Sequence, residues 1–249
     1  MQKVTPYSDS RNKKEQVEEM FDNIAYRYDF LNHLLSLGID IRWRKKAVQF
    51  IGSSNPKIIL DVASGTGDFA IEALALHPEK IVAFDLSESM LKICWQKAEK
   101  RNAVNIIECI KGDSEKMPFA ENSFDAVTVG FGVRNFENLE VGLKEIFRVL
   151  KPNGKLAILE ASLPENTIIR ALYSCYFGKI VPIVGRIFSK DVRAYKYLPE
   201  SVYAFPKGLE FVKILENIGF GNIKWNALTF GACAFYTAEK KPLITLMRT

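Results

Sequence analysis

The amino-acid sequence predicts an α/β fold, in which helices flank both faces of a doubly wound, mostly parallel sheet of seven strands, in one domain that takes in all 249 residues. Apolar segments of strand length alternate with helical segments through most of the chain, as is typical of such a sheet. Residues 58–62 are apolar apart from Asp61, as expected for a parallel strand that is buried on both faces. The last two strands, residues 223–230 and 232–239, are separated by Gly231 alone, so they must be antiparallel.

Two helices are expected before the first strand. Apolar residues recur at helical spacing over residues 16–37, Gly38 ends this pattern, and a second helix is expected over residues 41–50. A linker rich in Gly, Ser, Asn and Pro, residues 52–56, then leads into the first strand. The helical region, residues 16–52, has two interpretations that the sequence leaves open. It completes the core, or it forms a lid over a ligand pocket.

A glycine-rich turn follows the first strand and opens a helix. Gly65 and Gly67 let the backbone bend tightly and approach a ligand, and the free amides that begin the helix favour a negatively charged group. The pattern Gly65-x-Gly67-x-x-Ala70 also fits a looser dinucleotide fingerprint, with Asp85 at the distance expected of a ribose-binding acid. The turn therefore predicts a nucleoside cofactor, NAD or S-adenosylmethionine (SAM), without separating the two. The alternative is a tight turn that binds nothing.

Polar residues follow the next strands at the same edge of the predicted sheet. The second strand ends in Asp85, which can accept hydrogen bonds from both hydroxyls of a ribose, or else is a plain surface acid. The third strand, residues 106–110, is followed by Asp113 and Ser114, which would lie beside an adenine ring. The fourth strand ends before Gly130. These positions predict a ligand crevice along the carboxyl ends of the strands.

Residues 164–200 break the alternation of strands and helices. This segment is expected to form an inserted helical cover with an apolar face, because its apolar residues recur at helical spacing. It also carries basic charge, at Arg170, Lys179, Arg186, Lys190, Arg193 and Lys196. A last helix is expected over residues 210–219, before the two closing strands.

Composition limits the function classes. The formal net charge of +5 is too small to argue for nucleic acid, but it is compatible with attraction to an anionic membrane surface. Four cysteines without paired spacing suggest neither a zinc site nor a disulfide framework, and a reducing, cytoplasmic location is expected. No secretory signal and no uncharged segment long enough to cross a bilayer is found. No grouping of carboxylates and histidines in the sequence suggests a metal, so no metal cofactor is expected.

The sequence resembles a known family over nearly its whole length. Residues 60–68 look like the first motif of class I SAM-dependent methyltransferases, and residues 118–125 and 148–154 resemble later motifs of that class. Residues 131–135 and 195–201 are similar to the quinone C-methyltransferases that complete menaquinone and ubiquinone. The same likeness extends to Met20-Phe21, Tyr28-Asp29 and Asn32. The family often has glycine where Ser64 stands and serine where Gly130 stands, so Gly130 cannot offer a hydroxyl to the cofactor.

The resemblance implies SAM as the cofactor, and the charge of the turn agrees with it. SAM has no diphosphate, whereas Asp61 and Asp68 would repel the diphosphate of NAD. Asp61 and Asp68 can instead serve the ammonium group of SAM. The cofactor-binding residues that this implies are Asp61, Gly65, Thr66, Gly67, Asp85, Leu86, Asp113, Ser114 and Gly130.

The resemblance also implies methylation of a ring carbon, which needs a phenolate as the nucleophile. Arg134 would stabilise the phenolate and lower its pKa, while Asn135 orients it. Asp68, directly or through a water, is the candidate proton acceptor, and Tyr28 is a candidate hydrogen-bond partner. Two alternatives stay open: Arg134 forms an ion pair with a helix acid, or His33 contacts the substrate.

The implied substrate is a prenylated quinol, in particular demethylmenaquinol, which would become menaquinol. A benzoquinol of the ubiquinone pathway, another small aromatic, an NAD-linked oxidoreductase activity and a non-catalytic scaffold are the alternatives. The helical cover would hold the prenyl tail, and Arg186, Lys190 and Arg193 would hold the enzyme against an anionic bilayer as a peripheral membrane protein. A homodimer is also considered.

Overall fold

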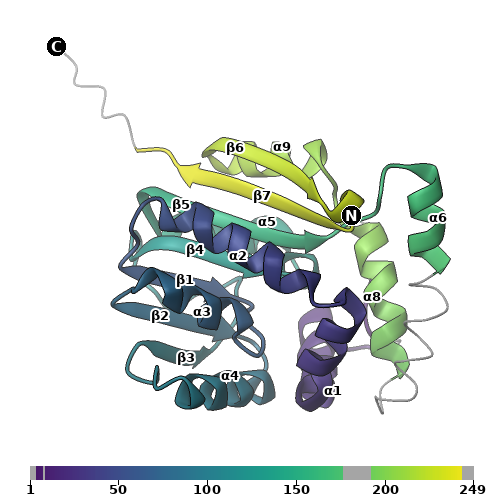
Figure 1. Ribbon diagram of the computed structural model, residues 1–249, viewed down its shortest axis with the longest axis horizontal. Coiled ribbons are helices and arrows are strands. Elements are labelled where there is room, and N and C mark those ends of the chain that lie inside the picture. Colours follow the sequence, from purple (N-terminus) through teal and green to yellow (C-terminus); the bar gives the residue numbers. More distant parts are fainter. Residues whose placement is uncertain (1–3, 8, 176–191, 243–249) are drawn as a thin grey trace.

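The computed structural model describes residues 4–7, 9–175 and 192–242. Within these ranges the chain forms a seven-stranded sheet with helices packed on both faces (Figure 1). No helix in the described residues is both long enough and apolar enough to cross a membrane. Two of the basic residues expected to face a bilayer, Arg186 and Lys190, lie outside the described residues, as does Lys179.

The sheet has seven strands, as the sequence predicts. In spatial order its strands are β3, β2, β1, β4, β5, β7 and β6. The bounds are β1 (Ile58–Val62), β2 (Lys80–Asp85), β3 (Ile107–Lys111), β4 (Phe124–Gly130), β5 (Leu150–Ala161), β6 (Phe220–Leu228) and β7 (Cys233–Lys240). β7 lies between β5 and β6 and is antiparallel to both, whereas β1 to β5 are mutually parallel. The predicted fold class, including the antiparallel last strand, is therefore confirmed.

The order of the strands reverses between β1 and β4. From β1 the chain proceeds outward to β2 and β3, and then returns to place β4 on the other side of β1. In open α/β sheets the crevice at such a switch point, outside the carboxyl ends of the strands, is where ligands bind. The loops after β1 and β4 are therefore the first places to examine for a site.

Helices cover the two faces of the sheet and its carboxyl edge (Figure 1). The helices are α1 (Lys13–Ser36), α2 (Ile39–Gly52), α3 (Asp68–Ala73), α4 (Glu88–Lys100), α5 (Leu139–Val149), α6 (Thr167–Cys175), α8 (Val192–Ala204) and α9 (Leu209–Ile218), with short 3-10 turns η1 (Leu74–Leu76), η2 (Val133–Asn135) and η4 (Thr229–Gly231). α2, α3 and α4 pack on one face and α5 and α9 on the other. α1, α6 and α8 lie beyond the carboxyl ends of the parallel strands.

The buried first strand explains why its sequence is apolar without alternation. Its successive side chains point to opposite faces, and both faces are core. Leu60 and Val62 belong to the cluster under α5 and α9, whereas Ile59 belongs to the cluster under α2, α3 and α4. Asp61 is the exception, a fully buried carboxyl in the middle of this core.

Several boundaries differ from the sequence-based expectation, three of them with consequences for the fold. α1 begins at Lys13, three residues earlier than expected, because the side chain of Asn12 caps it by accepting a hydrogen bond from the Glu15 backbone N–H at 2.8 Å. β5 begins at Leu150, inside the motif at residues 148–154, and its pairing with β4 shifts register between Phe124 and Ala126. β6 begins at Phe220 instead of residue 223, and η4 separates it from β7.

Candidate functional site

Three cavities meet at the carboxyl edge of the sheet. We call them the acidic cavity, the turn cavity and the apolar cavity, and their volumes are about 80, 40 and 470 Å³. Tyr28 of α1 and Phe131, the residue after β4, line all three. Phe131 has a left-handed backbone with φ of 58°, a conformation that is unfavourable for a bulky residue and recurs at functional sites. The junction of the cavities is thus fixed by a strained residue at the switch point of the sheet.

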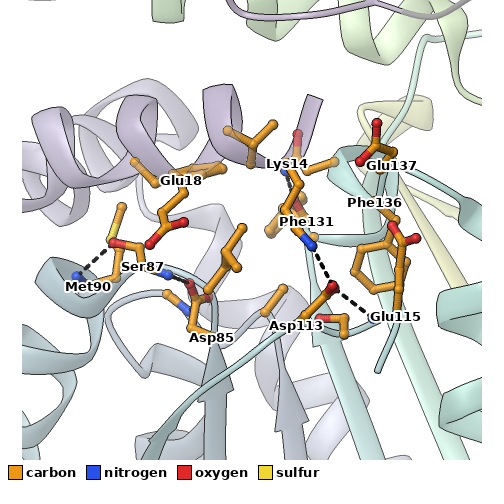
Figure 2. Close-up of a pocket in the computed structure, with 18 of the residues that line it drawn as sticks. Lys14, Glu18, Asp85, Ser87, Met90, Asp113, Glu115, Phe131, Phe136 and Glu137 are labelled. Atoms are coloured by element: carbon orange, nitrogen blue, oxygen red, sulfur yellow. Dashed lines mark hydrogen bonds and ion pairs between the residues drawn. The ribbon is translucent and has the colours of Figure 1, made fainter. Parts of the chain in front are cut away.

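The acidic cavity lies over the ends of β2 and β3 (Figure 2). Asp85, the last residue of β2, accepts hydrogen bonds from the backbone N–H groups of Gly65 at 2.7 Å and Ser87 at 2.8 Å. Burial raises the pKa of Asp85 to about 6. Asp113, after β3, forms an ion pair at 2.9 Å with Lys14, which reaches it from α1.

The acidic cavity brings together most of the predicted cofactor residues. Those that line it are Gly65, Asp85, Leu86, Asp113, Ser114 and Gly130. Two carboxylates at the ends of adjacent strands, with small residues between them, suit the hydroxyls and ring nitrogens of a nucleoside. A diphosphate would meet Glu18, Asp85, Glu115 and Glu137 as like charges.

The turn cavity lies beside the glycine-rich turn and ends at a carboxylate oxygen without a partner. Asp61 is fully buried, and its Oδ1 accepts a hydrogen bond from Thr128 Oγ1 at 2.9 Å. Its Oδ2 has no hydrogen-bond partner among the described residues, and neither has the hydroxyl of Ser64. Burial raises the pKa of Asp61 to about 7. Because unpaired buried carboxylates are costly, this oxygen fits a cationic ligand group such as an ammonium.

Thr66 and Asp68 also line the turn cavity, whereas Gly67 lines none of the three. Gly67 has φ of 80°, and a Cβ built on it would lie 2.3 Å from the Sγ of Cys94 in α4. The structure therefore explains this glycine by close packing of the turn on α4 and not by contact with a ligand.

Cations surround the carboxylate of Asp68. Lys97 Nζ lies 2.6 Å from Oδ1 and Arg44 Nη2 lies 2.8 Å from Oδ2. Burial acts to raise the pKa of Asp68, but Arg44 and Lys97 outweigh it and hold this pKa below its ordinary value. Such a carboxylate is a weak base, so the geometry does not favour the predicted role of Asp68 as direct proton acceptor.

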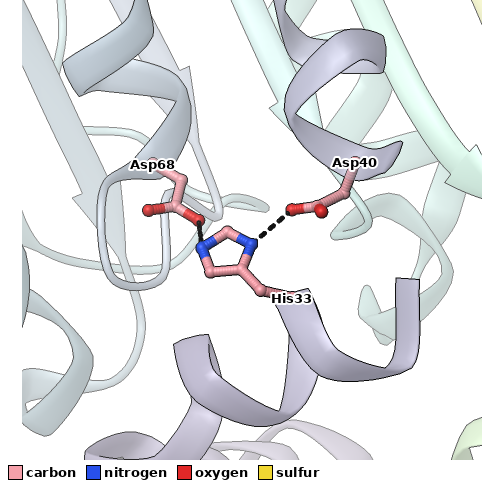
Figure 3. A group of neighbouring side chains, drawn as sticks. All are labelled: His33, Asp40 and Asp68. Atoms are coloured by element: carbon pink, nitrogen blue, oxygen red, sulfur yellow. Dashed lines mark hydrogen bonds and ion pairs between the residues drawn. The ribbon is translucent and has the colours of Figure 1, made fainter. Parts of the chain in front are cut away.

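His33 lies between Asp40 and Asp68 (Figure 3). Its Nδ1 is 2.9 Å from Asp40 Oδ2 and its Nε2 is 3.5 Å from Asp68 Oδ2. The three side chains place ligand atoms within 4.8 Å of one another, a grouping that the sequence does not reveal because they belong to three different helices. Arg44 already contacts both carboxylates, so the group is held by ion pairs. His33 lines none of the three cavities, which does not support the alternative that it contacts the substrate.

α1 lies across the acidic and turn cavities and is tied by polar contacts to the end of β3, to the loop after β2 and to α4. Glu18 pairs with Lys111 at 2.7 Å, Asp22 accepts a hydrogen bond from Ser87 Oγ at 2.5 Å, and Asp29 pairs with Lys97 at 2.5 Å. This arrangement agrees with the lid interpretation of the N-terminal helices, although opening of the lid stays a prediction.

The apolar cavity is large enough for a ring system with part of a tail, because small-molecule sites span about 300–1,000 Å³. It lies between α1, the start of α2, α6, α8 and η4. Its lining is mostly apolar, and includes Met20, Ile24, Leu37, Ile39, Trp43, Ile169, Leu198 and Phe230. The polar groups Tyr28, Arg134 and Asn135 also line it, and Tyr28 and Asn135 are shared with the acidic cavity.

Arg134 is buried and held by residues from three elements. Its Nη1 pairs with Glu160 Oε1 of β5 at 2.5 Å and also donates to the backbone oxygen of Phe131, and its Nε donates to Ser201 Oγ of α8 at 3.3 Å. Burial opposes its charge, yet Glu160 more than compensates, and the pKa of Arg134 is raised. Nη2 makes no hydrogen bond within the described part of the chain, so it can bind an oxygen in the apolar cavity. The ion-pair alternative for Arg134 is therefore also realised, but with a strand acid instead of the expected helix acid.

Asn135 and Tyr28 complete this end of the cavity. Asn135 Oδ1 accepts a hydrogen bond from Tyr197 Oη of α8 at 3.0 Å, which fixes the direction of its amide. Burial raises the pKa of Tyr28 to about 12, so this phenol stays protonated and can donate a hydrogen bond at neutral pH.

The sequence analysis missed Glu160, Tyr197 and Ser201 as site residues. Glu160 carried a usable signal, because it ends an apolar strand in the same way as Asp85 does. Tyr197 and Ser201 fall within residues 195–201, whose resemblance to the family assigns no role to either side chain.

The sequence matches a known family and named relatives over nearly its whole length. The model of the ubiE/COQ5 methyltransferase family matches residues 9–240. A demethylmenaquinone methyltransferase of Bacteroides fragilis is 45% identical over 240 residues, which cover 96% of this chain and 98% of that protein. A ubiquinone/menaquinone biosynthesis C-methyltransferase UbiE of Geotalea uraniireducens is 46% identical over 230 residues, covering 92% and 97% respectively.

Solved structures share the fold at lower identity. A putative methyltransferase of Bacillus halodurans superposes with a TM-score of 0.58 at 24% identity, covering 80% of this chain and 99% of that one. A SAM-dependent methyltransferase of Aquifex aeolicus gives a TM-score of 0.54 at 23% identity, covering 74% and 82%. At this level of identity the likeness establishes the fold alone.

Proposed function

The chain belongs to the ubiE/COQ5 methyltransferase family, and we propose that it transfers the methyl group of SAM to a ring carbon of demethylmenaquinol, giving menaquinol. The meeting of the three cavities at Tyr28 and Phe131 is the observation that carries this proposal, because a charged cavity that suits a nucleoside and an apolar cavity that suits a substrate ring then adjoin at one point. The names of the relatives from Bacteroides fragilis and Geotalea uraniireducens support the same reaction.

The residues of the acidic and turn cavities fit SAM. Asp61 Oδ2 would hold the ammonium group, Asp85 the ribose hydroxyls, and Asp113 with Ser114 the adenine. Each oxygen of Asp85 accepts a backbone N–H, from Gly65 or Ser87, and keeps a second lone pair for a ribose hydroxyl. When bound, SAM supplies an electrophilic methyl group on a positively charged sulfur.

Arg134 is the residue that we propose makes the quinol ring nucleophilic. Loss of a proton from a quinol hydroxyl spreads negative charge onto the neighbouring ring carbon, which can then attack the methyl group. Arg134 Nη2 would bind the phenolate oxygen and so lower the pKa of the hydroxyl. Asn135, oriented by Tyr197, and protonated Tyr28 would fix the direction of the ring.

The apolar lining of the substrate cavity would favour the reaction. Opposite charges on phenolate and sulfonium are neutralised as the new bond forms, so exclusion of water lowers the barrier relative to solution. Two protons are removed in turn, one from the hydroxyl before attack and one from the methylated carbon afterwards, and the oxygen then regains one to give the neutral quinol, so that a single proton is released overall. We propose that a water beside Asp68 accepts the two protons in turn, since Asp68 itself is a weak base.

Incubation of the purified chain with SAM and demethylmenaquinol, read by mass spectrometry, tests the proposed function. The expected product is heavier by one methyl group in place of one hydrogen. A parallel incubation with a benzoquinol of the ubiquinone pathway tests the second candidate substrate, which the name of the Geotalea relative suggests. Absence of a methylated product with either quinol would contradict the proposal, and binding of NAD in place of SAM would favour the oxidoreductase alternative.

Work at a membrane surface is part of the proposal, because a prenylated quinol resides in a bilayer. The cytoplasmic location, the independence from metal ions and the homodimer remain predictions. Of the three basic residues expected to contact lipid, only Arg193 lies within the described residues, on α8, where its side chain is exposed.

A further inference from the structure

We infer that the chain binds an anionic lipid bilayer through an apolar surface on α1 and the two turns at the mouth of the apolar cavity, so that this cavity opens toward the lipid. We call this surface the docking face and define it as Tyr26, Phe30, Leu34, Leu37, Ile41 and Phe230. The inference rests on the proposed function for its purpose, but its evidence is independent of the chemistry of the site. It also differs from the sequence-based expectation, which placed lipid contact on residues 186–193.

The outer side of α1 is apolar where a solvated helix would be polar. Tyr26, Phe30 and Leu34 are spaced four residues apart, so they share one side of the helix. Their exposed fractions are 95%, 56% and 41%. Met20, Ile24 and Tyr28, also spaced four residues apart, form another side of α1, and this side lines the apolar cavity. α1 is therefore apolar on two sides, and the side with Tyr26, Phe30 and Leu34 is exposed to solvent.

Two further residues of the docking face lie at the mouth of the apolar cavity. Leu37 and Phe230 both line this cavity, yet 79% and 78% of their surfaces are exposed. Both also have left-handed backbones, with φ of 53° and 57°. This conformation costs about 1 kcal/mol for residues with a Cβ, and it is typically retained where function requires it. Here it holds two large apolar side chains outward, where water gives them no stabilisation.

The turns that carry Leu37 and Phe230 are joined to each other. Leu37 ends α1, and α2 begins two residues later. Trp43 of α2 donates a hydrogen bond at 2.9 Å to the hydroxyl of Thr229, the neighbour of Phe230. Ile41, in the first turn of α2, is 42% exposed. The two turns of the docking face are thus linked to each other beside the cavity that Leu37 and Phe230 line.

Positive charge lies next to the docking face. Arg42, Lys45 and Lys46 follow Ile41 on α2, and all three are exposed. In the described part of the chain none of them forms an ion pair. Exposed apolar residues flanked by unpaired basic residues are the signature of a surface that lies on anionic lipid. A protein partner with an acidic rim would match the charges, but it would block the mouth through which a lipid substrate must enter.

Partitioning of the full chain onto vesicles tests the inference. Vesicles of phosphatidylglycerol and phosphatidylcholine are compared with pure phosphatidylcholine, by co-sedimentation. The variant Tyr26→Gln/Phe30→Gln/Leu34→Gln and the variant Arg42→Glu/Lys45→Glu/Lys46→Glu are each expected to lower partitioning onto the anionic vesicles by about tenfold or more. Glutamine and glutamate are good helix formers, and none of the substituted residues lines a cavity, so SAM binding should be unchanged.

Matched controls lie on the other side of the molecule. Val141→Gln/Leu209→Gln removes exposed apolar residues of α5 and α9, and Lys144→Glu/Lys213→Glu/Lys224→Glu reverses three exposed lysines. Both controls should partition like the unmodified chain. Equal loss in controls and variants would overturn the inference, as would no loss in either. A dimer in solution that the α1 variant converts to monomers would also overturn it, because the face would then join two copies.

Activity on two forms of the substrate separates this inference from the proposed function. The α1 variant should methylate a tail-less, water-soluble quinol at the unmodified rate and a long-tailed quinol in anionic vesicles about tenfold more slowly. If the unmodified chain methylates neither form, the proposed function fails, while the vesicle partitioning still decides the docking face. If the variant loses activity equally on both forms, the face supports the fold instead of lipid contact.

Discussion

The proposed cofactor side of this site, which is the acidic and turn cavities, and the proposed substrate side, which is the apolar cavity, are built in different ways. The acidic and turn cavities are formed largely by loops that directly follow β1 to β4, and the sheet fixes their positions. The apolar cavity is formed by α1, α2, α6, α8 and η4, which come together from both ends of the chain. Among the described residues, the first side is charged and contains a buried carboxylate oxygen without a hydrogen-bond partner, whereas the second is mostly apolar and has the cation of Arg134 at one end.

This difference suggests that the sheet and its loops can conserve the cofactor site while the helices that form the substrate site change. Strand-end loops cannot move without disturbing the central sheet, but the helices of the substrate side pack on it from outside. The small apolar cluster formed by Tyr7, Val17, Met20 and Tyr197 joins α1 to α8 separately from the two clusters on the sheet. Substitutions on the two sides should therefore have separable effects on SAM binding and on turnover.

Replacement of Arg134 should give the largest effect on turnover. Arg134→Ala is expected to lower kcat by about 10²–10³-fold, because it removes the group that stabilises the developing phenolate. The Kd for SAM should change by less than about twofold, since Arg134 lines only the apolar cavity. Turnover assays and calorimetry measure the two quantities. An equal loss of turnover and SAM binding would show that Arg134 supports the fold instead.

Substitution of the two turn glycines should distinguish a role in packing from a role in ligand contact. Gly67→Ala is expected to lower the free energy of unfolding by about 3 kcal/mol, because φ is 80° and the new Cβ would meet Cys94 Sγ at 2.3 Å. Gly65→Ala should cost about 1 kcal/mol, since nothing lies within 4 Å of its Cβ, and should mainly weaken SAM binding. Urea unfolding and SAM titration of both variants check this. A reversed order of stabilities would contradict the packing account of Gly67.

Asp61 should make SAM binding depend on pH. Because its pKa is raised to about 7, the free carboxyl is largely protonated below that pH, and binding of an ammonium must release the proton. SAM affinity should therefore rise as the pH increases through about 7. Asp61→Asn should bind SAM about 10–100-fold more weakly above this range and lose the rise. Calorimetric titration across pH, with Asp113→Asn for comparison, provides the test.

The same group has a consequence for stability without SAM. The folded-state pKa of Asp61 lies above its unfolded value of 3.8, so the folded chain binds the proton more tightly between that pH and about 7. The contribution of Asp61 to the free energy of unfolding should therefore fall as pH rises across this window. Asp61→Asn should reduce that fall. A steeper fall in the variant than in the unmodified chain would contradict the assignment.

Tyr197 should give the smallest of these effects. Tyr197→Phe removes one hydrogen bond to Asn135 and is expected to lower kcat about fivefold, which corresponds to about 1 kcal/mol, with no change in SAM affinity. Tyr203→Phe, on the same helix but exposed, is the matched control and should have no effect. Similar losses in both variants would show that the helix, and not the hydrogen bond, is sensitive.

The residues that line the acidic cavity could largely be predicted from the sequence to lie together, because they directly follow recognisable strands. Asp85 and Asp113 needed only the rule that carboxyl ends of parallel strands share an edge. The substrate side could not be predicted in the same way. The ion pair of Arg134 with Glu160 depends on β4 pairing with β5, and the contact of Asn135 with Tyr197 depends on how a helix 62 residues away packs.

Packing also decided the roles that the sequence left open. The sequence treats Asp68 as a free carboxylate, but helix packing brings Arg44 and Lys97 to it and lowers its pKa. Gly67 reads as a ligand-binding glycine in the motif, but it is required by the approach of Cys94. In both cases the deciding neighbour lies on another helix, beyond the reach of local patterns.

Transfer of an isotopically labelled methyl group tests the central claim most directly. The chain is incubated with SAM labelled with carbon-13 in its methyl group and with demethylmenaquinol, and the product is examined by nuclear magnetic resonance. The account predicts that the label appears as a methyl group on a ring carbon of the quinol. A label on a hydroxyl oxygen, or no label in the quinol at all, would contradict it.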